Sequence, residues 1–176
     1  MEFKKVMGLR KSARAYSDKK VSDEQIRALL EAGSMAPVGR AMYETLHYTV
    51  ITDGAVLKEM SDKALEAAGN VGGNSPLYGA PAFILVSTKT EMANNLGIAN
   101  ASCVIDHMHM AAVDMGLASC YIWGCVQPFK ADPEMAKIFK LPEGFTPVAG
   151  LIVGYAAETD QTERPMENKI ATDYIC

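Results

Sequence analysis

Between residues 81 and 87 the sequence reads PAFILVS, and between residues 148 and 153 it reads VAGLIV. Both stretches are almost wholly apolar and lack the alternation of apolar and polar residues that marks a strand with one face in water. Such runs suit strands that are buried on both faces. The two stretches therefore predict a central sheet covered by helices, in an α/β or α+β arrangement.

Helix signals lie between the N-terminus and the first of these strands. Ser22 with Gln25 forms a capping-box pattern, which predicts a helix that ends near Met35. A β-rich stretch follows at residues 46–52, and Asp53 is a suitable cap for a second helix to about residue 68. The first half of the chain thus alternates helices with strands.

The longest helical pattern covers residues 91–115, with Thr88 and Glu91 in capping-box spacing at its start. At about 100° per residue it carries one broad apolar face and a narrower apolar seam on the opposite side. The broad face contains Ile98, Ala101, Val104, Ile105, Met108, Ala111, Ala112 and Met115, and the seam contains Ala99, Cys103 and Met110. We expect this helix to lie between its own sheet and either another helix or a second subunit, and we favour a homodimer.

Shorter elements follow, with a strand expected at residues 118–123, a capped helix at 132–139, and a tail at 155–176 without clear periodicity. The length of 176 residues is usual for a single domain, so we expect residues 1–176 to share one core. A long tail without its own structure usually wraps something else.

Composition limits the classes of protein that this chain resembles. It is 49% hydrophobic and 22% charged, near the average of folded globular chains. Its apolar runs are far shorter than the ~18 to 20 residues of a membrane span, and residues 1–7 lack a signal-peptide pattern, so we expect a cytoplasmic protein without a membrane partner. The four cysteines are too scattered for a disulfide scaffold, and we expect free thiols.

The charge is unevenly distributed. The formal net charge of −4 opposes a nucleic-acid partner, but seven of the 17 Lys and Arg residues lie between Lys4 and Lys20. Within this segment Arg10, Ser12 and Arg14 alternate, so an extended backbone would direct all three side chains at one anion. The arrangement predicts a phosphate site, although a solvated basic loop is an equally good interpretation of the spacing alone.

Residues for chemistry by the protein itself are scarce. His107 and His109 point to different sides of a helix, and the Cys120 to Cys125 spacing is not that of a zinc pair, so no metal site is expected. The motifs of serine hydrolases, P-loop enzymes and dinucleotide-binding folds are missing. Cys120 and Cys125 are interpreted as packed residues more readily than as nucleophiles.

The stretch RKSARAY at residues 10–16, followed by the Ser22 helix, resembles the opening of the FMN-dependent nitroreductase family. The resemblance covers nearly the whole chain, because further short motifs occur in the family's order. These are Ala36-Pro37, Ala80-Pro81 with its buried strand, the long central helix, residues 116–120, and residues 150–155. It implies an α+β three-layer sandwich with a central, mostly antiparallel sheet covered by helices, in a homodimer whose tail, residues 155–176, packs on the partner subunit.

The same resemblance implies where FMN lies. The cofactor would be held by Arg10, Lys11, Ser12, Arg14, Trp123, Gly124 and Arg164. Among these, the backbone of Gly124 would approach flavin N5, while Trp123 would either cover the ring or pack. The chain departs from the family at residues 38–45, where Arg40 and Tyr43 become candidates for substrate binding.

The implied activity is ping-pong hydride transfer from NAD(P)H through flavin N5 to a nitroaromatic, a quinone or a similar electrophile. Such chemistry takes place on the cofactor, which agrees with the scarcity of acid–base residues. Two alternatives stay open: a flavoprotein with another electron donor, and a flavin-binding or anion-binding module without turnover.

Overall fold

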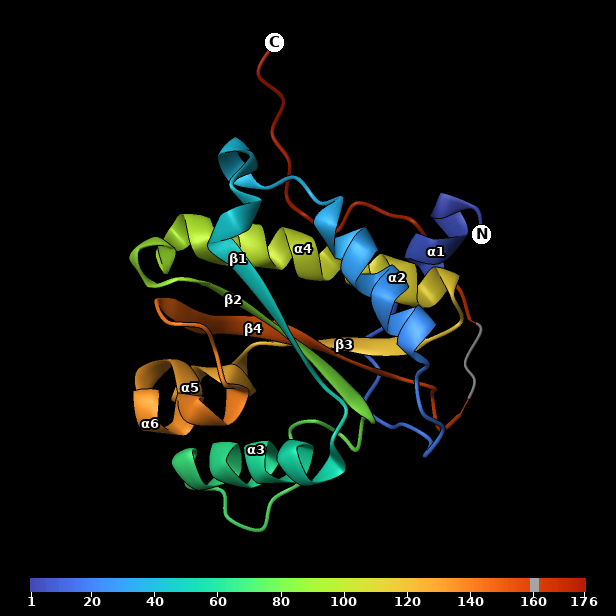
Figure 1. Cartoon of the computed structure of the whole chain (residues 1–176). Helices are drawn as coiled ribbons and strands as arrows, with labels where there is room; N and C mark the ends of the chain where they lie inside the picture. Colours follow the sequence, from blue (N-terminus) through green and yellow to red (C-terminus); the bar gives the residue numbers. More distant parts are fainter. Residues whose placement is uncertain (159–161) are drawn as a thin grey trace.

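The computed structural model describes residues 1–158 and 162–176 and has three layers, with a four-stranded sheet in the middle (Figure 1). All neighbouring strands are antiparallel, in the order β1-β2-β4-β3. The strands are β1 (Leu46–Ile51), β2 (Ala82–Lys89), β3 (Ala118–Ile122) and β4 (Phe145–Gly154). The predicted α+β sandwich with an antiparallel sheet is confirmed.

Helices cover both faces of the sheet (Figure 1). One face carries α1 (Phe3–Leu9), α2 (Asp23–Ser34) and α4 (Asn95–Asp114), and the other carries α3 (Gly54–Ala67), α5 (Gln127–Ala131) and α6 (Pro133–Ala136). The predicted caps of α2 and α3 are confirmed. Ser22 and Gln25 form the capping box of α2, and the Asp53 side chain accepts hydrogen bonds from the backbone of Ala55 and Val56.

The two apolar stretches form the centre of the sheet, because β2 and β4 pair with each other. Side chains of β2 alternate between two hydrophobic clusters. Ile84 and Val86 pack with residues of α2 and α4, whereas Phe83 and Leu85 pack with residues of α3 and α5. All four are fully buried, as expected for a strand with helices on both faces. On β4, Gly150 is required, since an added Cβ would lie 2.4 Å from the Phe83 ring.

The long helix starts later than its sequence pattern predicts. Thr88 remains in β2, where it pairs with Thr146 of β4, so the expected capping box of Thr88 and Glu91 does not form. The helix α4 begins instead after Asn94, whose side chain accepts hydrogen bonds from the first turn. The pairing of Thr88 with β4 therefore extends the strand through residues where the local sequence pattern predicted the start of a helix.

The C-terminal tail is largely extended. Residues 162–176 contain no helix or strand, and they pass near α1 before the chain end leaves the body (Figure 1). In the expected helix at 132–139, only Pro133–Ala136 is α-helical, and a 3-10 turn continues to Phe139. Among the helices of the described residues, none is long and apolar enough to cross a membrane.

Candidate functional site

The basic N-terminal segment is fastened to the start of the edge strand β3. Ser12 and Ser119 form an isolated parallel bridge, and the Ala13 N–H donates to the Ser119 carbonyl at 3.0 Å. A second isolated bridge joins Tyr16 to Ala156 just after β4. These contacts fix the segment against the edge of the sheet, where its side chains surround a cavity.

This cavity has a volume of about 460 Å³. Lys11, Ser12 and Arg14 line it from the N-terminal segment, Ser119 lines it from β3, and residues 155–158 form another part of its wall. Ser12 and Arg14 are exposed side chains. An ammonium group, a hydroxyl and a guanidinium therefore surround one cavity, which is the set of donors that a phosphate prefers.

Arg10 does not line this cavity but turns toward α4. Its Nη1 lies 3.1 Å from Nε2 of His109, which is buried. Burial lowers the pKa of Arg10, and the nearby Arg164 lowers it further, while the carboxylate of Asp106 offsets this only in part. An excess of positive charge thus remains at Arg10, which an anion would relieve.

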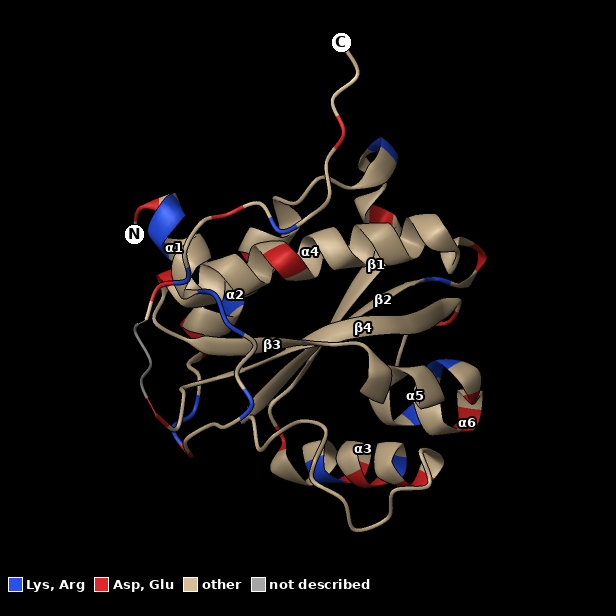
Figure 2. Ribbon diagram, turned by 180° about the vertical axis from the view of Figure 1, so that it is seen from behind, with Lys and Arg blue, Asp and Glu red and all other residues tan. Residues whose placement is uncertain are grey.

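Arg164 reaches this place from the far end of the chain. Its backbone N–H donates to the Gly8 carbonyl at 3.0 Å, and its guanidinium donates to the Met7 carbonyl at 3.2 Å. Figure 2 shows basic residues on α1 and on the chain segments that run beside it. The structure therefore brings together Arg10 and Arg164, which the sequence separates by most of its length.

Trp123 and Gly124 follow the opposite end of β3. Trp123 is 52% exposed, so it is not a packed core residue. A Cβ built on Gly124 would have no neighbouring atom within 4 Å, so the backbone at Gly124 is open to a ligand. Ser119 and Trp123 lie about 13 Å apart along the strand, from a rise of about 3.3 Å per residue. One elongated ligand can span both ends.

Arg40 and Tyr43 lie elsewhere in the chain. The segment that carries them is held by the Gly39 N–H, which donates to Oδ1 of Asn100 at 2.9 Å. Asn100 is about 13 Å from His109 along α4, from the rise of 1.5 Å per residue. Within one chain, the two candidates for substrate binding are therefore not brought to the cavity.

The backbone around Arg40 is unusual. Arg40 and Ala41 have φ angles of 60° and 54°, so two successive residues with side chains adopt the left-handed conformation. Each such residue costs on the order of 1 to 2 kcal/mol. The Tyr43 hydroxyl donates to the Ala36 carbonyl at 3.1 Å, which helps to hold the turn. Arg40 itself is exposed at the tip.

His109 is a site residue that the sequence interpretation missed. It contacts Arg10 through Nε2 and the Ser119 hydroxyl through Nδ1, at 2.5 Å. Burial and the charges of Arg10 and Arg164 lower its pKa to about 4. The available signal was its spacing, since His109 follows Ile105 and precedes Ala112 on the broad apolar face of the helix, where a polar residue needs a partner.

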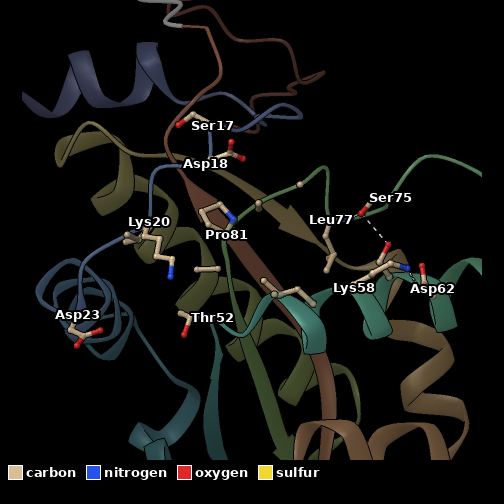
Figure 3. A pocket seen from close by; sticks show the side chains of 17 residues that line it. Ser17, Asp18, Lys20, Asp23, Thr52, Lys58, Asp62, Ser75, Leu77 and Pro81 are labelled. Carbon is tan, nitrogen blue, oxygen red and sulfur yellow. Dashed lines mark hydrogen bonds and ion pairs between the residues drawn. The ribbon is translucent and has the colours of Figure 1, made fainter.

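A larger cavity lies apart from these residues. It has a volume of about 760 Å³ and lies between the N-terminal end of α3 and the loops at residues 17–23 and 75–82 (Figure 3). Its charged side chains have both signs, and Lys58 forms an ion pair with Asp62 within it. None of the predicted site residues lines this cavity. The described part of the chain also contains no group of three His, Cys, Asp or Glu residues that could hold a metal.

The fold is an α+β sandwich, and the cavity at the edge of its sheet is lined by basic side chains that suit an anionic small molecule. The particular family follows from comparison with known proteins. The Nitroreductase family profile matches residues 9–155, and the chain belongs to this family.

Individual relatives are distant. A protein of Archaeoglobus fulgidus, named as a candidate NADH dehydrogenase/NAD(P)H nitroreductase, is 27% identical over 156 residues, which are 88% of this chain and 85% of the relative. The FMN reductase (NAD(P)H) of Bacillus subtilis is 28% identical over 169 residues, with 84% of this chain and 63% of the relative covered. A nitroreductase with bound FMN from Bacteroides fragilis has a TM-score of 0.86 at 25% identity, with 99% of both chains covered.

Proposed function

We propose that this chain binds FMN along residues 10–16 and the edge strand β3, and that it is an NAD(P)H-dependent oxidoreductase. The observation that carries the proposal is the cavity lined by Lys11, Ser12 and Arg14. Arg10, which precedes Lys11 in the chain, and the neighbouring Arg164 add positive charge beside this segment, although neither residue lines the cavity. Such a cluster favours a phosphate, the group that distinguishes FMN from riboflavin. The FMN in the Bacteroides fragilis nitroreductase supports the choice of ligand.

The opposite end of β3 fits the flavin ring. Gly124 leaves space where a side chain would stand, and Trp123 offers a half-exposed aromatic face beside it. A flat, largely apolar ring gains from contact with an aromatic side chain, and a glycine permits close approach of the backbone. The residues present therefore suit both the anionic and the planar part of FMN.

The bound cofactor would supply the hydride chemistry at N5, with NAD(P)H as donor and a nitroaromatic, quinone or similar electrophile as acceptor in a ping-pong cycle. The residues of the chain would bind the cofactor and orient it. Lys11 and Arg14, which line the cavity, would hold the negative charge of the ligand, and Arg10 and Arg164 would add positive charge that favours an anionic form of it. The neutral imidazole of His109 accepts a hydrogen bond from Arg10, and we assign it no role as an acid in the reaction.

We also propose that the chain acts as a single-domain homodimer, with residues 155–176 packed on the partner subunit. The tail supports this proposal, because it leaves the body with apolar side chains exposed, among them Ile170 and Ile175. In such a dimer, Arg40 and Tyr43 of one protomer would face the site of the other and contact the substrate. The exposed, strained turn at Arg40 fits a residue that contacts a second molecule.

The test is an absorption spectrum from 300 to 550 nm of the protein after incubation with FMN and removal of free ligand, repeated after anaerobic addition of NADH or NADPH. Flavin bands that are retained and then bleached by a nicotinamide are the expected result. Retained bands that neither nucleotide bleaches would contradict the assigned donor, and a protein that retains no flavin would contradict the FMN site itself.

A further inference from the structure

We infer that His109 is a positioning residue that holds the Arg10 guanidinium in a fixed place relative to the segment that carries Ser12, and that the preference of the proposed site for a phosphate depends on this arrangement. The inference rests on the proposed FMN site and deepens it. It concerns a buried side chain of α4 that has no contact with the cavity in which the ligand would lie.

The hydrogen bonds of His109 determine its tautomer. A guanidinium has donors only, so Nε2 of His109, 3.1 Å from Arg10 Nη1, must accept. The proton of the neutral ring is then on Nδ1, which donates to the Ser119 hydroxyl at 2.5 Å. The ring is 4% exposed, and water therefore cannot readily replace either partner. Each ring nitrogen has one defined role.

Ser119 connects the histidine to the second part of the site. Its side chain accepts from His109, while its backbone bridges Ser12 and accepts from the Ala13 N–H. One imidazole thus links the Arg10 side chain to the segment that carries Ser12. A shift of the ring would move both, which is the property expected of a residue that sets the geometry of a binding site.

The electrostatics explain why the ring stays neutral. Burial disfavours the charged imidazole, and the positive charges of Arg10 and Arg164 disfavour it further, so that the pKa of His109 is lowered to about 4. Asp106 and Cys120 act on Arg10 in the opposite direction, but the pKa of Arg10 is still lowered. The acceptor at Nε2 therefore persists at neutral pH, and the positive charge of the site is reserved for the anion.

An apolar residue would satisfy burial alone at this position, because Ile105 and Ala112 occupy the neighbouring turns of the same face. The test therefore uses variants at His109 that keep a polar side chain and differ in which of its two hydrogen bonds, to Arg10 or to Ser119, they can form. The side-chain amide of Gln reaches about as far as Nε2 and can still accept from Arg10. The shorter amide of Asn reaches about as far as Nδ1, so His109→Asn keeps the Ser119 contact and loses the contact with Arg10.

The measurement is the dissociation constant of the apoprotein for FMN and for riboflavin, by flavin fluorescence at pH 7.5. We expect His109→Asn to weaken FMN binding about tenfold, the effect of losing one hydrogen bond to a charged group, and to leave riboflavin binding unchanged. His109→Gln should restore most of the preference for FMN. The matched control is His107→Asn, since His107 is exposed on the same helix and its ring nitrogen Nδ1 contacts the Cys103 carbonyl of that helix. In His107→Asn, the dissociation constants for FMN and for riboflavin should both equal those of the wild type.

The inference would be overturned if His109→Asn left the ratio of the two dissociation constants as in the wild type, either because neither constant changed or because both rose equally. If His109→Asn does not fold, His109→Leu provides the second test, because it keeps an apolar side chain of similar size in the buried position but has no acceptor for Arg10. The ratio should then fall severalfold, and an unchanged ratio would overturn the inference as well. A wild-type protein that binds FMN no better than riboflavin would overturn the proposed phosphate site, and the role of His109 with it.

Discussion

Arg14 offers a sharp test of the proposed phosphate site, because it lines the cavity while its side chain is exposed. Replacing Arg14 by Ala removes one guanidinium from the ligand and little from the folded protein. A hydrogen bond to a charged group contributes about 1.5 to 3 kcal/mol, and each 1.4 kcal/mol is a factor of ten in affinity. We expect the dissociation constant for FMN to rise by about 10- to 100-fold, with the free energy of unfolding changed by less than about 0.5 kcal/mol.

The assay is isothermal titration of apoprotein with FMN, together with thermal unfolding of each variant. Arg14→Lys keeps the positive charge but lacks the planar guanidinium, so its dissociation constant for FMN should lie between those of the wild type and Arg14→Ala. Arg27→Ala is the matched control, since Arg27 is exposed on α2 and its loss changes the net charge equally. The difference between Arg14→Ala and wild type should shrink at high salt. If Arg14→Ala and Arg27→Ala bind FMN alike, the reasoning about the cavity is refuted.

Three further predictions concern glycines, a helix cap and pH. Gly150→Ala should destabilise the protein by about 3 kcal/mol or more, because the added Cβ would lie 2.4 Å from the Phe83 ring. Gly124→Ala should instead leave the free energy of unfolding unchanged and weaken FMN binding, because a Cβ there has space in the free protein. Urea titrations and flavin titrations of both variants check this contrast. Asp53→Ala removes the cap of α3 and should lower the unfolding free energy by about 1 kcal/mol, a fall in Tm of about 2 to 4 °C by calorimetry. The pKa of His109 is lowered to about 4 from 6.5, so the neutral imidazole stabilises the folded protein above pH 6.5. This contribution, about 3 kcal/mol, is lost as the pH falls from 6.5 through 4. If the free energy of unfolding of His109→Gln had the same slope with pH as that of the wild type in this range, the prediction would be contradicted.

The sequence predicted the sheet well because its signals are local. The apolar stretches became β2 and β4, and the predicted caps Ser22 and Asp53 are in place, since each of these caps depends on a few consecutive residues. The start of α4 was predicted wrongly because pairing between Thr88 and Thr146 is a long-range contact that the local pattern does not contain. Helix α5 was missed for a related reason, as its cap Val126 makes no side-chain hydrogen bond.

The sequence predicted several residues of the candidate site, but it did not predict how they contact one another in the fold. The alternation of Arg10, Ser12 and Arg14 pointed to an anion, but it placed all three on one side, whereas Arg10 turns to His109 in the fold. Neither that contact nor the approach of Arg164 to α1 leaves a trace in local spacing, because both depend on how distant segments pack. The resemblance to a family supplied Arg164, and only the structure supplied His109.

The central claim is that FMN lies along β3, with its ring at Gly124, and the chain carries a reporter at that place. Trp123 is the only tryptophan in the sequence, and it is half-exposed next to Gly124. The measurement is the tryptophan fluorescence of the apoprotein during titration with FMN, with binding followed in parallel by flavin fluorescence. We predict strong quenching that saturates at one FMN per chain, with the same dissociation constant as the flavin signal. Saturable FMN binding that leaves the Trp123 emission unchanged would contradict the account, and so would the failure of FMN to bind.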